Sequence, residues 1–378
     1  MVKAAYLHIP FCEHICHYCD FNKVFLKGQP VDEYLQALDK EIKLTFSNDP
    51  GEPLQTIFVG GGTPTSLNEK QLYTFCESLL ENLPRENQLE FTFEANPGDL
   101  TKEKLQILKE AGVNRISLGV QTFNDELLKK IGRAHRAKDV FASVANAKEI
   151  GFENVSIDLI FSLPGQTVSD FKDTLNEAFT LDVTHYSGYS LIIEPKTVFY
   201  NLMKKGKLFT PGEDIEAEMY ELLMEKMALH GFQQYEISNF AKPGFESRHN
   251  LTYWNNEFYF GFGAGAHSYV DGWRRSNAGP LKKYMDFIQN GLPPIFEEHY
   301  VTKKEQMEEE MFLGLRKTKG VSILKFRDKF KMDPLQYFQS EIVELKQKGW
   351  IEVGNGAIYL TKTGRLLGNE VFQSFLGA

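Results

Sequence analysis

Cysteine is scarce in this sequence, because the 378 residues contain only four. Four cysteines are too few for a disulfide framework in a chain of this length, so we expect a reducing compartment. No stretch approaches the roughly 18 consecutive apolar residues of a membrane-spanning helix. The opening residues, MVKAAYLHIPF, contain too short an apolar run for a signal peptide. The composition therefore predicts a cytoplasmic protein and leaves peripheral attachment to the inner face of a membrane open.

Basic residues are fewer than acidic ones: the sequence has 42 Lys and Arg and 51 Asp and Glu, which gives a formal net charge of −9. Nucleic acid is a polyanion and is therefore not expected as a partner. The charge is uneven, since residues 301–378 contain 13 Lys and Arg against 10 Asp and Glu. That small excess, without a basic stripe on one helix, does not indicate a nucleic-acid-binding surface.

Strand-like and helix-like segments alternate over the first 240 residues. Strands are expected at 4–10, 56–62, 89–97, 115–121, 154–161 and 185–193. Helices are expected at 31–44, 67–83, 101–112, 125–131, 138–150, 169–179 and 213–230. Because strands separated by helices pair in parallel, the pattern predicts an α/β fold of six strand–helix units. Six units favour a partial (β/α)6 barrel over an open sheet.

The pattern changes after residue 240. Residues 241–300 are rich in aromatics and glycine and show no helical period, so we expect a connecting region there. From residue 301 amphipathic helices precede WIEVGNGAIYLT, a predicted hairpin around Gly354–Asn355–Gly356. We therefore expect a barrel in residues 1–240, a connecting region in 241–300 and a winged-helix-like module in 301–378. A docking or lid role for the module is favoured over DNA binding.

Three of the four cysteines crowd one loop, FCEHICHYCDF, where Cys12, Cys16 and Cys19 are spaced C-x3-C-x2-C. A structural zinc ion needs four ligands, and one short loop is a cramped source of them even with His14 or His17 as the fourth. A [4Fe-4S] cluster is wrapped readily by a short loop, and three thiolates leave one iron open. A cluster is therefore favoured, with zinc and reactive thiols as the alternatives.

The loop, together with the motifs YLHIPFC, GGGTPT, GVQTFN and IDLIFSLPGQT, resembles the radical S-adenosylmethionine (SAM) superfamily. Within that superfamily it is similar to the oxygen-independent coproporphyrinogen III oxidase branch. The resemblance covers nearly the whole chain, and it implies that SAM chelates the open iron and accepts an electron from the cluster. By position in the motifs it implies SAM contacts for Tyr6, Gly61, Gly62, Thr63, Glu94, Gln121, Arg133 and Asp158. Taken alone, the glycines predict a tight turn and the two carboxylates predict helix caps.

Two features depart from the decarboxylating oxidases of that branch. Those oxidases have a fourth cysteine where this chain has Phe21, and a sizeable segment before the loop, whereas eleven residues precede Cys12 here. Both departures fit a sister family of heme chaperones that is marked by the motif H-N-x-x-Y-W. His249, Asn250, Tyr253 and Trp254 match that motif, so the resemblance implies that they contact heme. His267 is a second candidate for heme contact, since imidazole is a common ligand of heme iron.

Together these features predict a protein that carries a [4Fe-4S] cluster and SAM, binds heme and hands the heme to acceptor hemoproteins. The expected acceptors are respiratory-chain components at the membrane. No catalytic residue is assigned, and whether the protein also catalyses a reaction stays open. The alternatives are a radical SAM oxidoreductase that decarboxylates coproporphyrinogen III, and a zinc-stapled binding module without redox chemistry. The sequence does not decide between a monomer and a homodimer.

Overall fold

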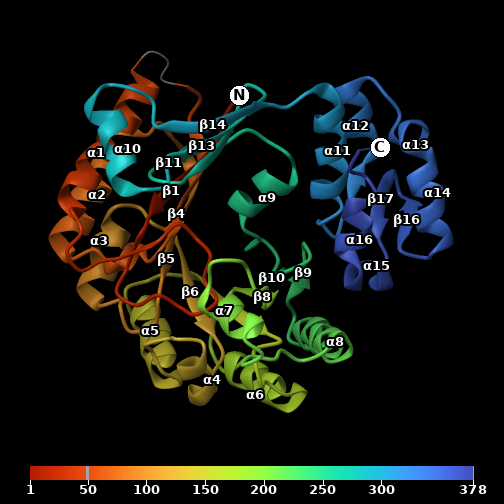
Figure 1. The fold of residues 1–378 in the computed structure, drawn as a ribbon, viewed down its shortest axis with the longest axis horizontal. Helices are drawn as coiled ribbons and strands as arrows, with labels where there is room; N and C mark the ends of the chain where they lie inside the picture. The colour runs from red at the N-terminus through yellow and green to blue at the C-terminus, as the bar shows by residue number, and fades with distance from the viewer. Residues whose placement is uncertain (48–50, 378) are drawn as a thin grey trace.

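The computed structural model describes residues 1–47 and 51–377. Its largest sheet has nine strands in the order β11-β1-β4-β5-β6-β7-β8-β10-β9. Six neighbouring strands pair in parallel and correspond to the six predicted ones: β1 (Ala4–Ile9), β4 (Leu54–Gly61), β5 (Arg85–Ala95), β6 (Arg115–Gln121), β7 (Asn154–Phe161) and β8 (His185–Ser190). They follow an arc in Figure 1, which confirms the predicted partial (β/α)6 barrel.

Helices connect these strands and cover the outer side of the arc (Figure 1). The predicted ones are α1 (Val31–Phe46), α2 (Glu69–Asn82), α3 (Lys102–Glu110), α4 (Asp125–Lys130), α5 (Ala137–Glu149), α6 (Val168–Ala178) and α8 (Glu213–Leu229). A short helix, α7 (Val198–Lys204), and a 3-10 turn, η1 (Pro64–Ser66), add to them. The Asn68 side chain caps the start of α2, because it accepts a hydrogen bond from the Gln71 N–H at 2.9 Å. Gly112, with φ +82°, follows the end of α3, as is typical of a helix C-terminus.

The segment after residue 230 extends the sheet at both ends. The short strands β9 (Gln233–Gln234) and β10 (Asn239–Ala241) run antiparallel beyond β8, and β11 (Phe260–Phe262) runs parallel beside β1. Between them lies the helix α9 (Arg248–Trp254), although the sequence shows no helical period in this region. This short helix depends on local capping and tertiary contacts rather than on an apolar face. The Ser247 side chain caps it by accepting from the Asn250 N–H.

A second sheet lies beside the barrel, and its three strands are antiparallel. They are β12 (His267–Val270), β13 (Trp273–Asn277) and β14 (Ile295–Tyr300), and the helix α10 (Leu281–Gln289) connects β13 to β14. The buried carboxylate of Glu41 on α1 ties this region to the barrel. It accepts hydrogen bonds from the Gly263 N–H at 2.8 Å, the Asn277 side chain at 2.7 Å and the Tyr284 hydroxyl at 2.6 Å. The connecting region is therefore fastened to the barrel by polar as well as apolar contacts.

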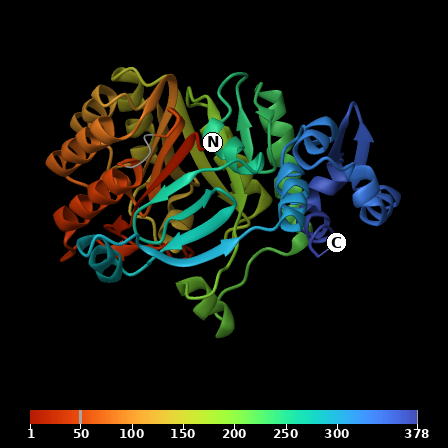
Figure 2. The ribbon, with the colours of Figure 1, turned by 90° about the horizontal axis from the view of Figure 1, so that it is seen from above.

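The C-terminal residues form a module of helices and a three-stranded sheet, seen at the right of Figures 1 and 2. Asn355 and Gly356 have positive φ angles of 51° and 76°, as a tight hairpin turn requires, so the predicted wing is present. A separate apolar core, which includes Phe326, Phe330 and Phe338, fills the module. Its elements are α11 (Lys303–Gly314), β15 (Val321–Ser322), α12 (Ile323–Phe330), α13 (Pro334–Tyr337), α14 (Gln339–Gln347), β16 (Ile351–Gly354), β17 (Ala357–Leu360), α15 (Lys362–Leu366) and α16 (Gly368–Gln373).

Candidate cofactor site

The three clustered cysteines lie beyond the C-terminal end of β1. Cys12 ends the short strand β2 (Phe11–Cys12), which pairs with β3 (Val24–Phe25), so the segment between them forms a loop that carries Cys16 and Cys19. Cys12 is buried, the other two are partly exposed, and all three are free thiols. Burial raises the pKa of Cys12 to about 11 and also raises the pKa of Cys19. Because the thiolate is the form that binds metal, a metal centre has to displace these protons.

Within residues 1–47 and 51–377, no three His, Cys, Asp or Glu side chains are arranged to hold a single metal ion. The three cysteines therefore stay predicted ligands of a cluster. Phe21, which stands where the fourth cysteine of the oxidases is expected, has a side chain that is 65% exposed. An exposed phenyl ring at this position cannot serve as a ligand.

The glycine-rich end of β4 fixes the backbone of the cysteine loop. The Gly62 N–H donates to the Ile9 carbonyl and the Thr63 N–H donates to the Phe11 carbonyl, both at 2.8 Å. The Thr63 hydroxyl also lies 3.7 Å from the Cys12 sulfur, to which it donates a hydrogen bond. A Cβ at Gly62 would lie 2.7 Å from the Pro10 carbonyl carbon, so only glycine permits this approach. The GGGT segment thus positions Cys12 directly.

Gly61 permits a second close contact, between the end of β4 and the ring of His8 on β1. It has φ +115°, and a Cβ there would lie 2.5 Å from the His8 ring. Burial lowers the pKa of His8, so the ring is neutral. Its Nε2–H donates to the Asn22 carbonyl at 2.7 Å, which leaves Nδ1 to accept from the Tyr6 hydroxyl at 3.0 Å. His8 therefore links the interior residue Tyr6 to the far end of the cysteine loop.

Two carboxylates from neighbouring parts of the sheet point into the barrel. Glu94 on β5 accepts a hydrogen bond from the Gly61 N–H at 3.1 Å, and Asp158 on β7 accepts one from the Ser117 hydroxyl at 3.4 Å. Burial, and then the charge of Asp158, raise the pKa of Glu94 to about 7. Burial also raises the pKa of Asp158. Such acids gain free energy from hydrogen-bond donors, such as ribose hydroxyls or an ammonium group, that satisfy them.

Arg133 provides the buried positive charge on the same rim. Its guanidinium donates to the Asn96 side chain at 2.7 Å and to the Gly119 carbonyl at 2.8 Å, whereas its buried Nε has no partner among the described residues. Gln121, at the end of β6, is buried and has an unusual φ of +69°. An unsatisfied guanidinium nitrogen fits a carboxylate ligand such as the methionine carboxylate of SAM. The sequence analysis did not identify Asn96 as a partner of Arg133, although Asn96 lies within the strand predicted at residues 89–97.

The H-N-x-x-Y-W motif lies on α9, on the inner side of the sheet. His249 is 1% exposed, and both of its ring nitrogens are engaged, Nδ1 with the Thr56 hydroxyl and Nε2 with the Tyr253 hydroxyl, each at 2.8 Å. The ring stacks on Phe58 with centroids 5.1 Å apart, and burial lowers its pKa to about 3. Glu90 fixes the start of the helix, because its carboxylate accepts from the backbone N–H of His249 at 2.9 Å.

The motif is therefore part of the barrel interior in this structure. The Trp254 indole N–H is buried without a partner among the described residues, and the Arg316 guanidinium lies 4.5 Å from the ring centroid. Asn250 is half-buried. His267, the second candidate for heme contact, is exposed on β12. Heme contact by these residues stays a prediction. Neither nitrogen of His249 is free to bind iron in this arrangement.

An aromatic ladder joins this motif to the cofactor side of the barrel. Phe58 stacks between His249 and Tyr6, with 6.2 Å between the centroids of Phe58 and Tyr6. Tyr6 then hydrogen-bonds His8, as described above. The ladder places the predicted heme motif and the predicted SAM residue Tyr6 in one packed row. In the sequence this row is visible only as Tyr6 and His8 at alternate positions of β1. Such an alternation is too common to indicate a functional site.

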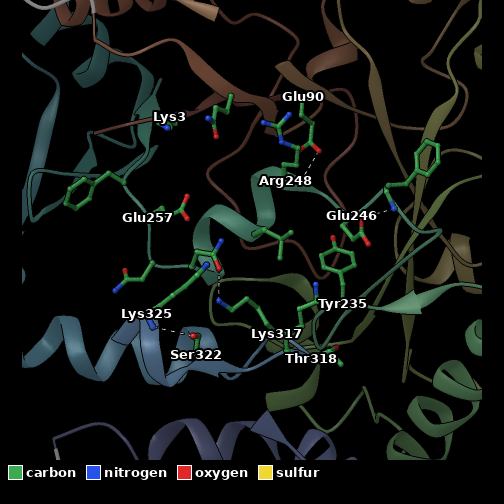
Figure 3. Close-up of a pocket in the computed structure, with 18 of the residues that line it drawn as sticks. Lys3, Glu90, Tyr235, Glu246, Arg248, Glu257, Lys317, Thr318, Ser322 and Lys325 are labelled. Atoms are coloured by element: carbon green, nitrogen blue, oxygen red, sulfur yellow. Dashed lines mark hydrogen bonds between the residues drawn. The ribbon is translucent and has the colours of Figure 1, made fainter. Parts of the chain in front are cut away.

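A large cleft opens at the other end of the strands, on the far side of α9 (Figure 3). Its volume is about 1880 Å³. One wall comes from residues at the N-terminal strand ends, such as Lys3, Gln55 and Asn154, and the opposite wall comes from residues 317–329 of the C-terminal module. The barrel thus has a cofactor side and a cleft side, with α9 between them. Among the described residues, no helix combines the length and apolar character needed to cross a bilayer.

Comparison with known protein families matches both halves of the architecture. Residues 6–178 match the radical SAM superfamily, and residues 301–367 match the HemN C-terminal domain. Among solved structures, the chain is similar to the Escherichia coli coproporphyrinogen III oxidase HemN, described as a radical SAM enzyme. The TM-score is 0.85 at 25% sequence identity, covering 99% of this chain and 90% of HemN.

Curated relatives are similar over the whole length. The heme chaperone HemW of Bacillus subtilis (strain 168) is 59% identical over 377 residues, which is 100% of both chains. The heme chaperone HemW of Lactococcus lactis subsp. lactis is 47% identical over 374 residues, 99% of this chain and 97% of the relative. That of Escherichia coli (strain K12) is 38% identical over 266 residues, 70% of this chain and 69% of the relative.

Proposed function

The chain belongs to the HemW family, and from this membership we propose that it is a heme chaperone, which binds heme and hands it to acceptor hemoproteins. The observation that carries the proposal is the 59% identity with the Bacillus subtilis heme chaperone over the full length of both chains. Phe21 supports it, because the loop offers no fourth cysteine where the decarboxylating oxidases have one.

The cysteine loop in this proposal holds a [4Fe-4S] cluster through Cys12, Cys16 and Cys19, with SAM beside it. When bound, the cluster supplies an electron to the sulfonium of SAM. The raised pKa of Glu94 and the unpartnered Nε of Arg133 support a polar ligand in the barrel interior. The SAM contacts we propose are Tyr6, Gly61, Gly62, Thr63, Glu94, Gln121, Arg133 and Asp158. Of these, Gly62 also permits the close approach of the cysteine loop to β4, and Gly61 permits the close approach of the His8 ring.

The motif residues His249, Asn250, Tyr253 and Trp254 contribute to heme binding through α9 in this proposal. His249 ties α9 to the sheet through Nδ1, which bonds the Thr56 hydroxyl on β4, while its Nε2 bonds Tyr253 of the same helix, so its loss disturbs the helix as a whole. Direct ligation of heme iron by His249 requires that Tyr253 give up its hydrogen bond. The exposed imidazole of His267 needs no such rearrangement.

We further propose that the acceptors are respiratory-chain hemoproteins, reached from the cytoplasm by peripheral attachment at the inner face of the membrane, and that the protein forms a homodimer. The division into a barrel (1–240), a connecting region (241–300) and a C-terminal module (301–378) belongs to the same proposal. The match of residues 301–367 to the HemN C-terminal domain supports the last of these parts.

Anaerobic titration with heme tests the function. The purified chain, reconstituted with iron and sulfide, should bind heme stoichiometrically at micromolar concentration, give a Soret band, and pass the heme to an apo-hemoprotein. His249→Ala should alter the Soret band or weaken binding. Absence of any heme-dependent spectrum at that concentration would overturn the proposal.

The likeness to HemN, with its TM-score of 0.85, favours a second candidate, a radical SAM oxidoreductase that decarboxylates coproporphyrinogen III. Anaerobic incubation with coproporphyrinogen III, SAM and a reductant separates the two functions. We expect no loss of the substrate. Clear SAM-dependent turnover would favour the oxidoreductase instead.

A further inference from the structure

The cleft on the far side of α9 has one edge that is rich in lysine, although acidic residues such as Glu257 and Glu310 also line the cleft. Lys317, Lys319, Lys325 and Lys329 of the C-terminal module line it. Among the described residues only Lys329 of these four forms an ion pair, with Glu310 at 2.7 Å. Figure 3 shows Lys317 and Lys325 on the module side of the cleft, across from Glu90 and Arg248. Unpaired ammonium groups at the rim of a cavity attract an anionic ligand.

Lys317 is the inner member of this edge. Its ammonium donates to the Asn255 side chain at 2.6 Å and has no carboxylate partner among residues 1–47 and 51–377. Burial is the main cause that lowers the pKa of Lys317; the charges of Lys325 and Lys329 also lower it, whereas those of Glu310 and Glu257 raise it. An anion bound at this ammonium group therefore offsets the cost of burying its charge, which Glu310 and Glu257 offset only in part.

Apolar side chains form part of the remaining wall. Phe245, Leu251 and Phe258 are half-buried at the cleft and come from α9 and the segments on either side of it. Asn256, also in the wall, is 5% exposed, and its side-chain N–H2 has no partner among the described residues. A ligand with a flat apolar body, an anionic edge and a hydrogen-bond acceptor satisfies all three features.

We propose that this cleft is the site where the protein holds a tetrapyrrole, with the tetrapyrrole carboxylates against Lys317 and Lys325 and the macrocycle against Leu251 and Phe258. The inference rests on the proposed heme-chaperone function and assigns it a location. The cleft volume of about 1880 Å³ exceeds the roughly 300–1,000 Å³ of an ordinary small-molecule site, so a molecule as large as heme fits. The site lies on the opposite side of α9 from the cysteine loop, and the motif helix itself is one of its walls.

The test compares heme affinity between variants of the full-length, cluster-reconstituted protein. Lys317→Gln combined with Lys325→Gln should weaken heme binding about tenfold, because each exposed charge pair contributes up to about a factor of five. Lys303→Gln combined with Lys346→Gln is the matched control. These two exposed lysines lie in the same module but outside the cleft, so heme affinity should not change.

A ligand variant and a steric variant complete the design. Heme dimethyl ester, which lacks the free carboxylates, should bind the parent protein and the Lys317/Lys325 variant equally. Leu251→Trp should block the cleft, whereas Val343→Trp, exposed on α14 and not among the residues that line the cleft, should not. Thermal unfolding of each variant excludes misfolding as the cause of lost binding.

The outcomes separate the location of the heme site from the heme-chaperone function. If the parent protein binds heme and both the lysine variant and Leu251→Trp bind it equally well, the cleft is not the site, while the chaperone function stands. If the parent protein binds no heme, the function fails and the site fails with it.

Discussion

A methyl group at Gly62 would collide with the backbone that leads into the first cysteine. An ideal Cβ there lies 2.7 Å from the carbonyl carbon of Pro10 and 2.8 Å from the carbonyl oxygen of Phe11. Real Cβ atoms essentially never come closer than 3.0 Å to another heavy atom, so one of the two backbone segments has to move. Both neighbours are main chain and cannot rotate away as a side chain would.

The expected cost follows from the contacts that this movement disturbs. Overpacking at a closely packed position costs about 1–3 kcal/mol. The displacement also stretches the hydrogen bonds from the Gly62 N–H to the Ile9 carbonyl of β1 and from the Thr63 N–H to the Phe11 carbonyl of the cysteine loop, both 2.8 Å long and worth roughly 0.5–1.5 kcal/mol each. We therefore expect Gly62→Ala to lower the free energy of unfolding by about 2–4 kcal/mol. Because Cys12 moves with this backbone, the iron and sulfide content after reconstitution should also fall.

Two measurements check this prediction: urea unfolding of the protein without its cluster, and iron and acid-labile sulfide analysis after anaerobic reconstitution. Gly212→Ala is the control, since Gly212 has a negative φ and no atom within 4 Å of an added Cβ. Its stability should change by less than about 1 kcal/mol. If Gly62→Ala matches this control in both stability and iron content, the argument that β4 positions the cysteine loop is wrong.

Three further predictions concern the thiols, the buried acid and the motif histidine. In iron and sulfide analysis, Cys19→Ala should lose most of the iron and sulfide, whereas Cys76→Ala should keep both. Because Cys76 is buried on α2, Cys76→Ala should lower the free energy of unfolding by about 1 kcal/mol in urea. Burial raises the pKa of Glu94 from 4.5 to about 7, so the folded state binds the proton more tightly. Stability should therefore fall as the pH rises from about 4.5 to about 7, and Glu94→Gln should flatten that slope in urea titrations of the cluster-free protein. His249→Ala should cost about 2–4 kcal/mol in the same assay, because it leaves a cavity and two unpaired hydroxyls, whereas a surface histidine would cost almost nothing.

The arrangement of the barrel was predictable because each strand and helix has a strong local signal. The asparagine that caps α2 acts within three residues of its own position. The same holds for the wing, where Asn355 and Gly356 form the turn. Such features need no knowledge of the rest of the chain.

The helix α9 was not predictable in this way, because its supports come from distant strands. Glu90 on β5 accepts the first backbone N–H groups of α9, and Thr56 on β4 binds the ring of His249. These partners are more than 150 residues away along the chain. For the same reason the sequence suggested heme contact at His249 without indicating that its ring is buried and hydrogen-bonded at both nitrogens.

The position of α9 between the two sides of the barrel has a consequence for how heme and SAM influence each other. His249 stacks on Phe58, and Phe58 packs against Tyr6, whose hydroxyl bonds His8 beside the cysteine loop. A ligand that shifts α9 from the cleft side also shifts the His249 ring against Phe58, because His249 lies on α9 and Phe58 lies on β4. Coupling between the two sites then requires no direct contact between heme and SAM. It requires only that heme prefer one position of α9, because a ligand shifts an equilibrium by no more than its difference in affinity for the two states.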